Sequence, residues 1–188
     1  MPRPLSPAFL LTFAQALVND AAAVDGGDES AIAANAKDAD WSATFVHHAG
    51  FWSHFDYRMG TSVWPLPATS SCTELAAFAA EHFVLAADQP EPGDVYLLWS
   101  PAKKLFVRAG IVLSRSRRFR YPSGRRYYEC LTIDGDTATD GSLRGGHTAV
   151  VQRVLSPSKG DRLIHWPLLE LMAVDQTWFG ELPLRRAA

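Results

Sequence analysis

The chain has 188 residues, of which 47% are hydrophobic and 20% are charged, and its formal net charge is −2. This composition excludes a wholly disordered segment and predicts a single domain over residues 1–188 with a sizeable core. The near-neutral charge excludes a general attraction of the whole protein to nucleic acid or to an anionic membrane. With two cysteines and no metal-binding spacing of Cys or His, the sequence predicts no metal site, no cofactor and no disulfide framework.

The first segment predicts an amphipathic helix over residues 7–23. Ser6 is a suitable N-cap and Pro7 fits the first helical position, and four apolar residues then share one face: Phe9, Leu10, Phe13 and Leu17. The segment also resembles a secretory signal, because Arg3 precedes an apolar run that ends in alanines. We favour the packed helix. A packed helix favours a cytoplasmic protein and a signal favours a periplasmic or secreted one, so the compartment stays open. The sequence predicts no transmembrane segment, since no stretch approaches the ~20 apolar residues that one needs.

Two further helices are predicted before the period of the sequence changes. One covers residues 40–50, with Asp40 as its N-cap and a buried face of Trp41, Phe45 and Ala49. Residues 50–70 are rich in Gly, Pro and aromatic residues and predict an ordered loop. The next helix covers residues 72–86, because Ser71-Cys72-Thr73-Glu74 fits a capping box.

The second half of the chain predicts strands at 95–99, 105–114, 127–135 and 148–156, joined by turns. Helices followed by consecutive strands indicate an α+β fold with an antiparallel sheet. The remaining residues, 157–188, contain many apolar side chains that have to pack, either within this chain or against a protein partner.

Five short motifs occur in this order: "WSATFV", "PEPGDVYLLW", "VRAGIVLS", "LTIDGDT" and "GSLRGGHTAVVQR". Together they resemble the motifs of CHAP-type peptidoglycan amidases, relatives of the NlpC/P60 peptidases. The resemblance covers residues 20–156 and leaves an N-terminal helix, 1–19, and a C-terminal extension, 157–188. It implies a small papain-like fold, with N-terminal helices packed on a four- to six-stranded antiparallel sheet.

The resemblance also implies the positions of the catalytic residues. The nucleophilic Cys of the family corresponds to Ser42, its His base to Arg108, and its orienting polar residues to Asp134 and Asp136. A serine needs a general base to remove its proton. Guanidinium stays protonated and cannot do so, so we expect Arg108 to hold a substrate carboxylate or to pair with Asp134.

Two functional hypotheses follow. The missing histidine favours a catalytically inactive domain with a binding or assembly role. The alternative is an active peptidoglycan hydrolase or amidase in which Ser42 is the nucleophile and His54, in the aromatic loop, is the base.

Two surfaces are candidates for partners. The aromatic residues near the predicted site predict either simple packing or a groove for a peptidoglycan or peptide ligand; they are Trp41, Phe51, Trp52, Phe55, Tyr57 and Trp64. The six arginines of the segment from Arg115 to Arg126 lie among aromatic residues, a combination typical of phosphate contact. For a chain with this net charge we favour a solvated hairpin over an anionic partner.

Overall fold

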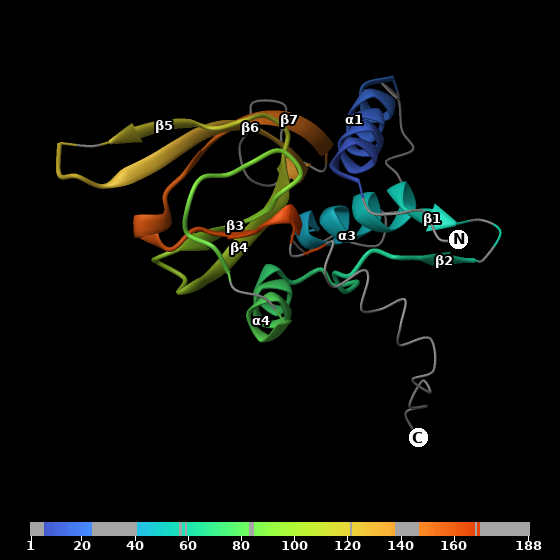
Figure 1. The fold of residues 1–188 in the computed structure, drawn as a ribbon, viewed down its shortest axis with the longest axis horizontal. Helices are drawn as coiled ribbons and strands as arrows, with labels where there is room; N and C mark the ends of the chain where they lie inside the picture. The colour runs from blue at the N-terminus through green and yellow to red at the C-terminus, as the bar shows by residue number, and fades with distance from the viewer. Residues whose placement is uncertain are drawn as a thin grey trace.

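The computed structural model describes residues 6–23, 41–56, 58, 60–82, 85–120, 122–137, 147–167 and 169. These residues form an α+β fold in which three α-helices accompany a curled antiparallel sheet (Figure 1). The predicted fold class is therefore confirmed at this level.

The three helices are α1 (Pro7–Ala23), α3 (Ser42–Ser53) and α4 (Cys72–His82). As predicted, α1 begins at Pro7 and the amide of Glu74 donates to Ser71 Oγ at the start of α4. The predicted cap of α3 is wrong: Trp41 occupies the N-cap position without a side-chain hydrogen bond. The predicted end of α4 at residue 86 is also wrong, because Ala86 forms a β-bridge with Leu163.

The six-stranded sheet has the order β5-β6-β4-β3-β8, with β7 paired to β6. The strands are β3 (Val95–Ser100), β4 (Leu105–Val112), β5 (Arg117–Arg120), β6 (Arg126–Thr137), β7 (His147–Leu155) and β8 (Arg162–Ile164). All of their pairings are antiparallel. The four predicted strands are confirmed as β3, β4, β6 and β7.

Four short strands and a 3-10 turn were not predicted. They are β1 (Phe55–Asp56) and β2 (Thr61–Ser62), which pair with each other, β5, β8 and the 3-10 turn η1 (Pro157–Lys159). Each is at most four residues long, which is too short for an alternating pattern to be visible in the sequence.

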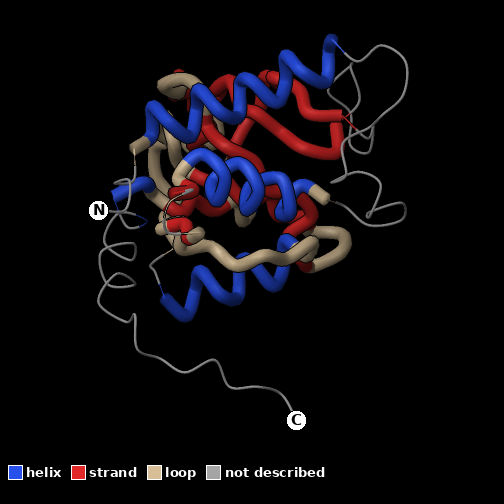
Figure 2. The backbone as a smooth tube through the Cα atoms, turned by 90° about the vertical axis from the view of Figure 1, so that its right-hand side faces the viewer, coloured by secondary structure: helices blue, strands red, loops and turns tan. Residues whose placement is uncertain are grey.

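The sheet has a helix face and an opposite face. On the helix face, Ala109, Ile111 and Ile133 are buried together with Phe45 and Val46 of α3. Figure 2 shows the three helices side by side over this face of the strands. Full burial of one such aliphatic or aromatic side chain stabilises the fold by roughly 1.5–3 kcal/mol, so this layer anchors α3.

The opposite face carries a second cluster, and neighbouring residues of a strand alternate between the two faces. This cluster contains Tyr96, Val112, Cys130, Leu155 and Leu163. Both faces of the central strands are therefore covered.

The start of the C-terminal extension packs within the same chain. β8 pairs with β3, and Leu163, Ile164, Trp166 and Leu169 are buried. This confirms packing within the chain for the described residues of the extension, 157–167 and 169, while the predicted contribution of residues 168 and 170–188 lies outside the described residues. None of the described helices combines the length and the apolar character that a bilayer crossing requires.

Candidate functional site

Ser42 is the first residue of α3 and is completely buried. Its Oγ accepts a hydrogen bond of 3.1 Å from the amide of Ala109 on β4, and it lies 3.3 Å from Cys72 Sγ at the start of α4. As predicted, the residue faces the strand that carries Arg108. The hydroxyl thus joins three elements of the core, α3, β4 and α4, and is not exposed to solvent.

Arg108 lies on β4 and is also completely buried. Its Nη1 donates to the carbonyl of Gly135 on β6 at 2.8 Å. A Cβ added to Gly110, two residues further along β4, would fall 2.5 Å from the Tyr96 ring and 2.8 Å from Asp134 Oδ1. Because positions 108 and 110 share one face of the strand, Arg108 points to the opposite face, away from α3.

Asp134 on β6 is a fully buried carboxylate, and its ionic partner is Arg153 on β7. Arg153 donates to Asp134 Oδ2 through Nε at 2.8 Å and through Nη2 at 2.5 Å. Thr132 Oγ1 donates to the other oxygen at 2.7 Å. The ion pair to Asp134 is therefore made by Arg153, where the sequence suggested Arg108. Asp136 also lies on β6, and its side chain is outside the described residues.

Arg153 and Tyr96 are the residues of this cluster that the sequence analysis did not predict. The sequence did contain a sign of Arg153, because this residue is the last one of the motif "GSLRGGHTAVVQR". In the structure it pairs with Cys130 across the β6–β7 ladder. Tyr96, also missed, is fully buried in the same cluster.

The titratable groups around Asp134 are unsuited to proton transfer near neutral pH. Burial, followed by the negative charge of Asp134, raises the pKa of the Tyr96 phenol well above its ordinary value. Burial, with Asp134 and Glu129, raises the pKa of the Cys130 thiol to about 12. The phenol and the thiol therefore both keep their protons at neutral pH.

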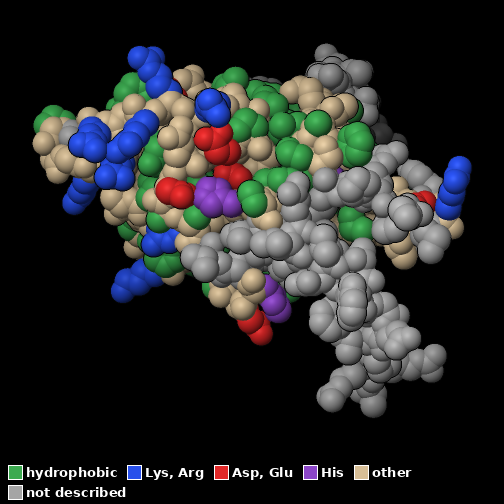
Figure 3. Space-filling view, in the orientation of Figure 1, with side chains coloured by type: hydrophobic (Ala, Val, Ile, Leu, Met, Phe, Trp, Pro, Cys, Tyr) green, Lys and Arg blue, Asp and Glu red, His purple; other side chains and the backbone are tan. Residues whose placement is uncertain are grey.

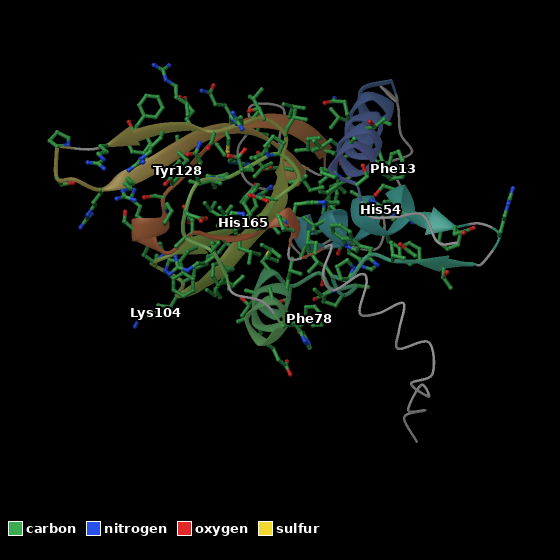
Figure 4. The ribbon with its side chains drawn as sticks, in the orientation of Figure 1. Phe13, His54, Phe78, Lys104, Tyr128 and His165 are labelled. Atoms are coloured by element: carbon green, nitrogen blue, oxygen red, sulfur yellow. The ribbon has the colours of Figure 1, made fainter. Side chains whose placement is uncertain are left out.

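His54 lies at the other end of α3 from Ser42, next to β1 (Figure 4). The two residues are twelve positions apart, so the helical rise separates them by roughly 18 Å. This geometry contradicts the expectation that His54 could serve as the base of Ser42.

The His54 ring is instead a fully buried part of the core. Its Nε2 accepts a hydrogen bond from the amide of Ser6, and its Nδ1 lies 2.9 Å from the carbonyl of Gly50. The ring also stacks on Trp64 at an interplanar angle of 11°. A neutral imidazole with its proton on Nδ1 can form both hydrogen bonds. These two bonds link the residue before α1, Ser6, to the end of α3.

The aromatic residues of the predicted groove do not form one surface, because some are buried in the core and others are exposed. Trp41 and Trp64 are buried in the core, whereas Trp52 is 38% exposed. Phe51 and Phe55 flank Trp52 with ring centroids at 5.3 Å and 4.9 Å. These three rings form an aromatic group at the end of α3, far from Ser42; Tyr57 lies outside the described residues.

His165 forms a second polar cluster that the sequence did not predict. Its Nδ1 lies 2.8 Å from Asp94 Oδ2 and its Nε2 lies 2.7 Å from Asp88 Oδ1. The hydrogen bond to Asp94, assisted by Asp88 and opposed by partial burial, raises the pKa of His165 to about 9. Asp94 also accepts a hydrogen bond from the amide of Trp166. The cluster therefore links the segment after β8 to the turn before β3 through hydrogen bonds.

Comparisons with known proteins add no assignment: no family model, no curated protein and no solved structure matches the chain. Among the described residues, no group of three or more His, Cys, Asp or Glu side chains is placed to hold a metal ion.

Proposed function

We propose that this chain is a catalytically inactive domain of the papain-like CHAP and NlpC/P60 type, with a binding or assembly role. The observation that carries the proposal is the state of Ser42, which is completely buried and accepts the amide hydrogen of Ala109. A nucleophile has to be reachable and needs a base within hydrogen-bond distance.

The replacement of a histidine by Arg108 supports the same conclusion. Arg108 is buried and donates to the Gly135 carbonyl, and a guanidinium group does not act as a general base. Its role in this proposal is to hold β4 to β6. The order of helices and antiparallel strands supports the papain-like type, since it matches the order that the motif resemblance implies.

The ligand class that the resemblance implies is peptidoglycan or its peptides. Ser42 itself is completely buried and so presents no surface to such a ligand. We therefore assign binding to the aromatic group of Phe51, Trp52 and Phe55, because an exposed Trp flanked by two rings suits contact with a sugar face.

The test is co-sedimentation of the protein with purified peptidoglycan sacculi. We expect the protein to pellet with the sacculi and Trp52→Ala to pellet several-fold less. A matched control is Phe9→Ala, which removes another exposed aromatic side chain, on α1, and should pellet as the unchanged protein does. Equal recovery of all three proteins in the supernatant would contradict the ligand assignment.

A further inference from the structure

The β5–β6 ribbon extends from the body of the sheet, and Lys and Arg side chains gather on it (Figures 1 and 3). The segment from residue 115 to residue 126 contains six arginines and no acidic residue. Since the whole chain has a formal charge of −2, the other residues together carry −8. Because of this separation of charge, a polyanion attracts the ribbon and repels the rest of the protein.

The pairing register divides these arginines between the two faces of the ribbon. Arg118 pairs with Tyr128, and Arg120 pairs with Arg126, so the three guanidinium groups share one face. Arg117 pairs with Glu129 and therefore lies on the other face, beside a carboxylate. We call the first set, Arg118, Arg120 and Arg126, the arginine face.

The arginine face has no internal counter-charge. All three side chains are exposed, and none of them forms an ion pair with any carboxylate of the described residues. Arg120 and Arg126 stand directly opposite each other across the ladder, an arrangement in which like charges destabilise a sheet. A bound anion removes this repulsion.

The side chains identify the chemistry of the anion. Every cation of the segment is an arginine, and guanidinium binds phosphate in a bidentate manner that an ammonium group cannot match. On the other face, Phe119 is stacked on Tyr127 with ring centroids at 5.1 Å, and the guanidinium of Arg117 lies 4.9 Å from the Phe119 ring. Because these rings already stack on their own neighbours, they are not free platforms for unpaired bases.

The shape of the ribbon favours a double helix. B-form DNA has a major groove about 12 Å wide and about 8.5 Å deep, which admits a two-stranded ribbon. Four paired residues extend roughly 13 Å, and the two strands lie about 4.8 Å apart. The deep, narrow major groove of A-form RNA excludes such an element.

We infer that the β5–β6 ribbon binds double-stranded DNA, with the arginine face in the major groove. The inference does not depend on whether Ser42 is inert. The test uses fluorescence anisotropy with the full chain and a labelled DNA duplex about two helical turns long. Single-stranded DNA, duplex RNA and vesicles of neutral and anionic phospholipid are the comparison ligands.

We expect duplex DNA to bind at least tenfold more tightly than each of the other ligands. The variant with Arg118, Arg120 and Arg126 all changed to Gln should lose at least tenfold in affinity. Its slope of log affinity against log salt should also fall by about 2.7, at roughly 0.9 for each phosphate contact. A charge-matched control changes the exposed Arg58, Lys103 and Lys104 to Gln, and it should stay within about twofold of the unchanged protein.

If the triple variant does not fold, the single variant Arg120→Gln replaces it in the DNA-binding assay. It removes the repulsion across the ladder, so it should melt no lower than the unchanged protein and still bind DNA several-fold more weakly. The inference is overturned if duplex DNA does not bind at low salt, or if the control loses as much affinity as the arginine-face variant. Equal or tighter binding of single-stranded DNA, RNA or anionic vesicles would overturn it as well.

Discussion

The amide of Ala109 donates a hydrogen bond to the Ser42 hydroxyl, and this contact joins the first turn of α3 to the middle of β4. The two residues are 67 positions apart in the sequence and both are fully buried. The motif resemblance predicts a nucleophile at position 42, and the serine hydroxyl found there links a helix to the sheet.

Removal of this hydroxyl should cost stability. Ser42→Ala leaves the buried amide of Ala109 without its acceptor, so we expect the free energy of unfolding to fall by about 1–3 kcal/mol. Urea denaturation followed by circular dichroism measures the change. Ser123→Ala, at an exposed turn position, is the matched control and should change stability by less than about 0.5 kcal/mol. An unchanged midpoint for Ser42→Ala would show that the bond stabilises nothing.

The short distance between Ser42 and Cys72 allows the placement of the two side chains to be tested with an engineered disulfide. Ser42 Oγ lies 3.3 Å from Cys72 Sγ, so Ser42→Cys places two thiols at a separation that a small shift closes to a disulfide. Under mild oxidation we expect loss of two titratable thiols in the unfolded protein and a peptide pair that joins residues 42 and 72. The unchanged protein is the control: its cysteines belong to different clusters and should both remain titratable. Three titratable thiols in the oxidised variant, those of residues 42, 72 and 130, would contradict the placement.

Local patterns were sufficient for most of the fold. The Ser6-Pro7 pair marked the start of α1, the capping box marked α4, and the alternating segments marked four strands of the sheet. The position of Ser42 at the start of a helix facing β4 also followed from the order of the motifs.

The contacts that were not predicted depend on residues far apart in the sequence. His54 was a candidate base because it lies in an aromatic loop, but its environment is set by the Ser6 amide, 48 residues away. Arg153 pairs with Asp134 because the β6–β7 ladder brings them together. β8 exists because Arg162–Ile164 reaches the edge of β3, and a three-residue strand has no pattern of its own.

The Asp134–Arg153 ion pair should be a sensitive point of the fold. The carboxylate side chain is fully buried and that of Arg153 is 14% exposed. Arg153→Met leaves a buried charge without its ionic partner, and we expect a loss of about 3–5 kcal/mol in the free energy of unfolding. The double change Asp134→Leu with Arg153→Met removes both charges and should cost less than Arg153→Met alone. Arg125→Met, in the exposed turn, is the control; an Arg153→Met variant as stable as this control would contradict the role of the pair.

The His165 cluster predicts a stability that depends on pH. Because Asp94 and Asp88 raise the pKa of His165 from 6.5 to about 9, the folded state binds this proton more tightly than the unfolded state does. The contribution is therefore fully present below about pH 6.5 and is lost as the pH rises through about 9. We expect it to be about 2 kcal/mol, which allows for the 70% exposure of the Asp88 side chain.

The measurement compares unfolding of the unchanged protein with that of His165→Gln at pH 6 and at pH 10. The stability difference should be largest at pH 6 and should shrink at pH 10. His82→Gln, on the exposed side of α4, should show no such trend. A difference that grows with pH would mean that His165 is neutral in the folded protein.

The most direct test of the central claim is turnover of peptidoglycan and of purified muropeptides by the unchanged protein and by Ser42→Ala. Product release is followed by liquid chromatography and mass spectrometry, and both proteins are first shown to be folded under the assay conditions. Since Ser42 is buried and bonded to Ala109, the account predicts no products above the no-enzyme background for either protein. Turnover by the unchanged protein that disappears in Ser42→Ala would contradict it.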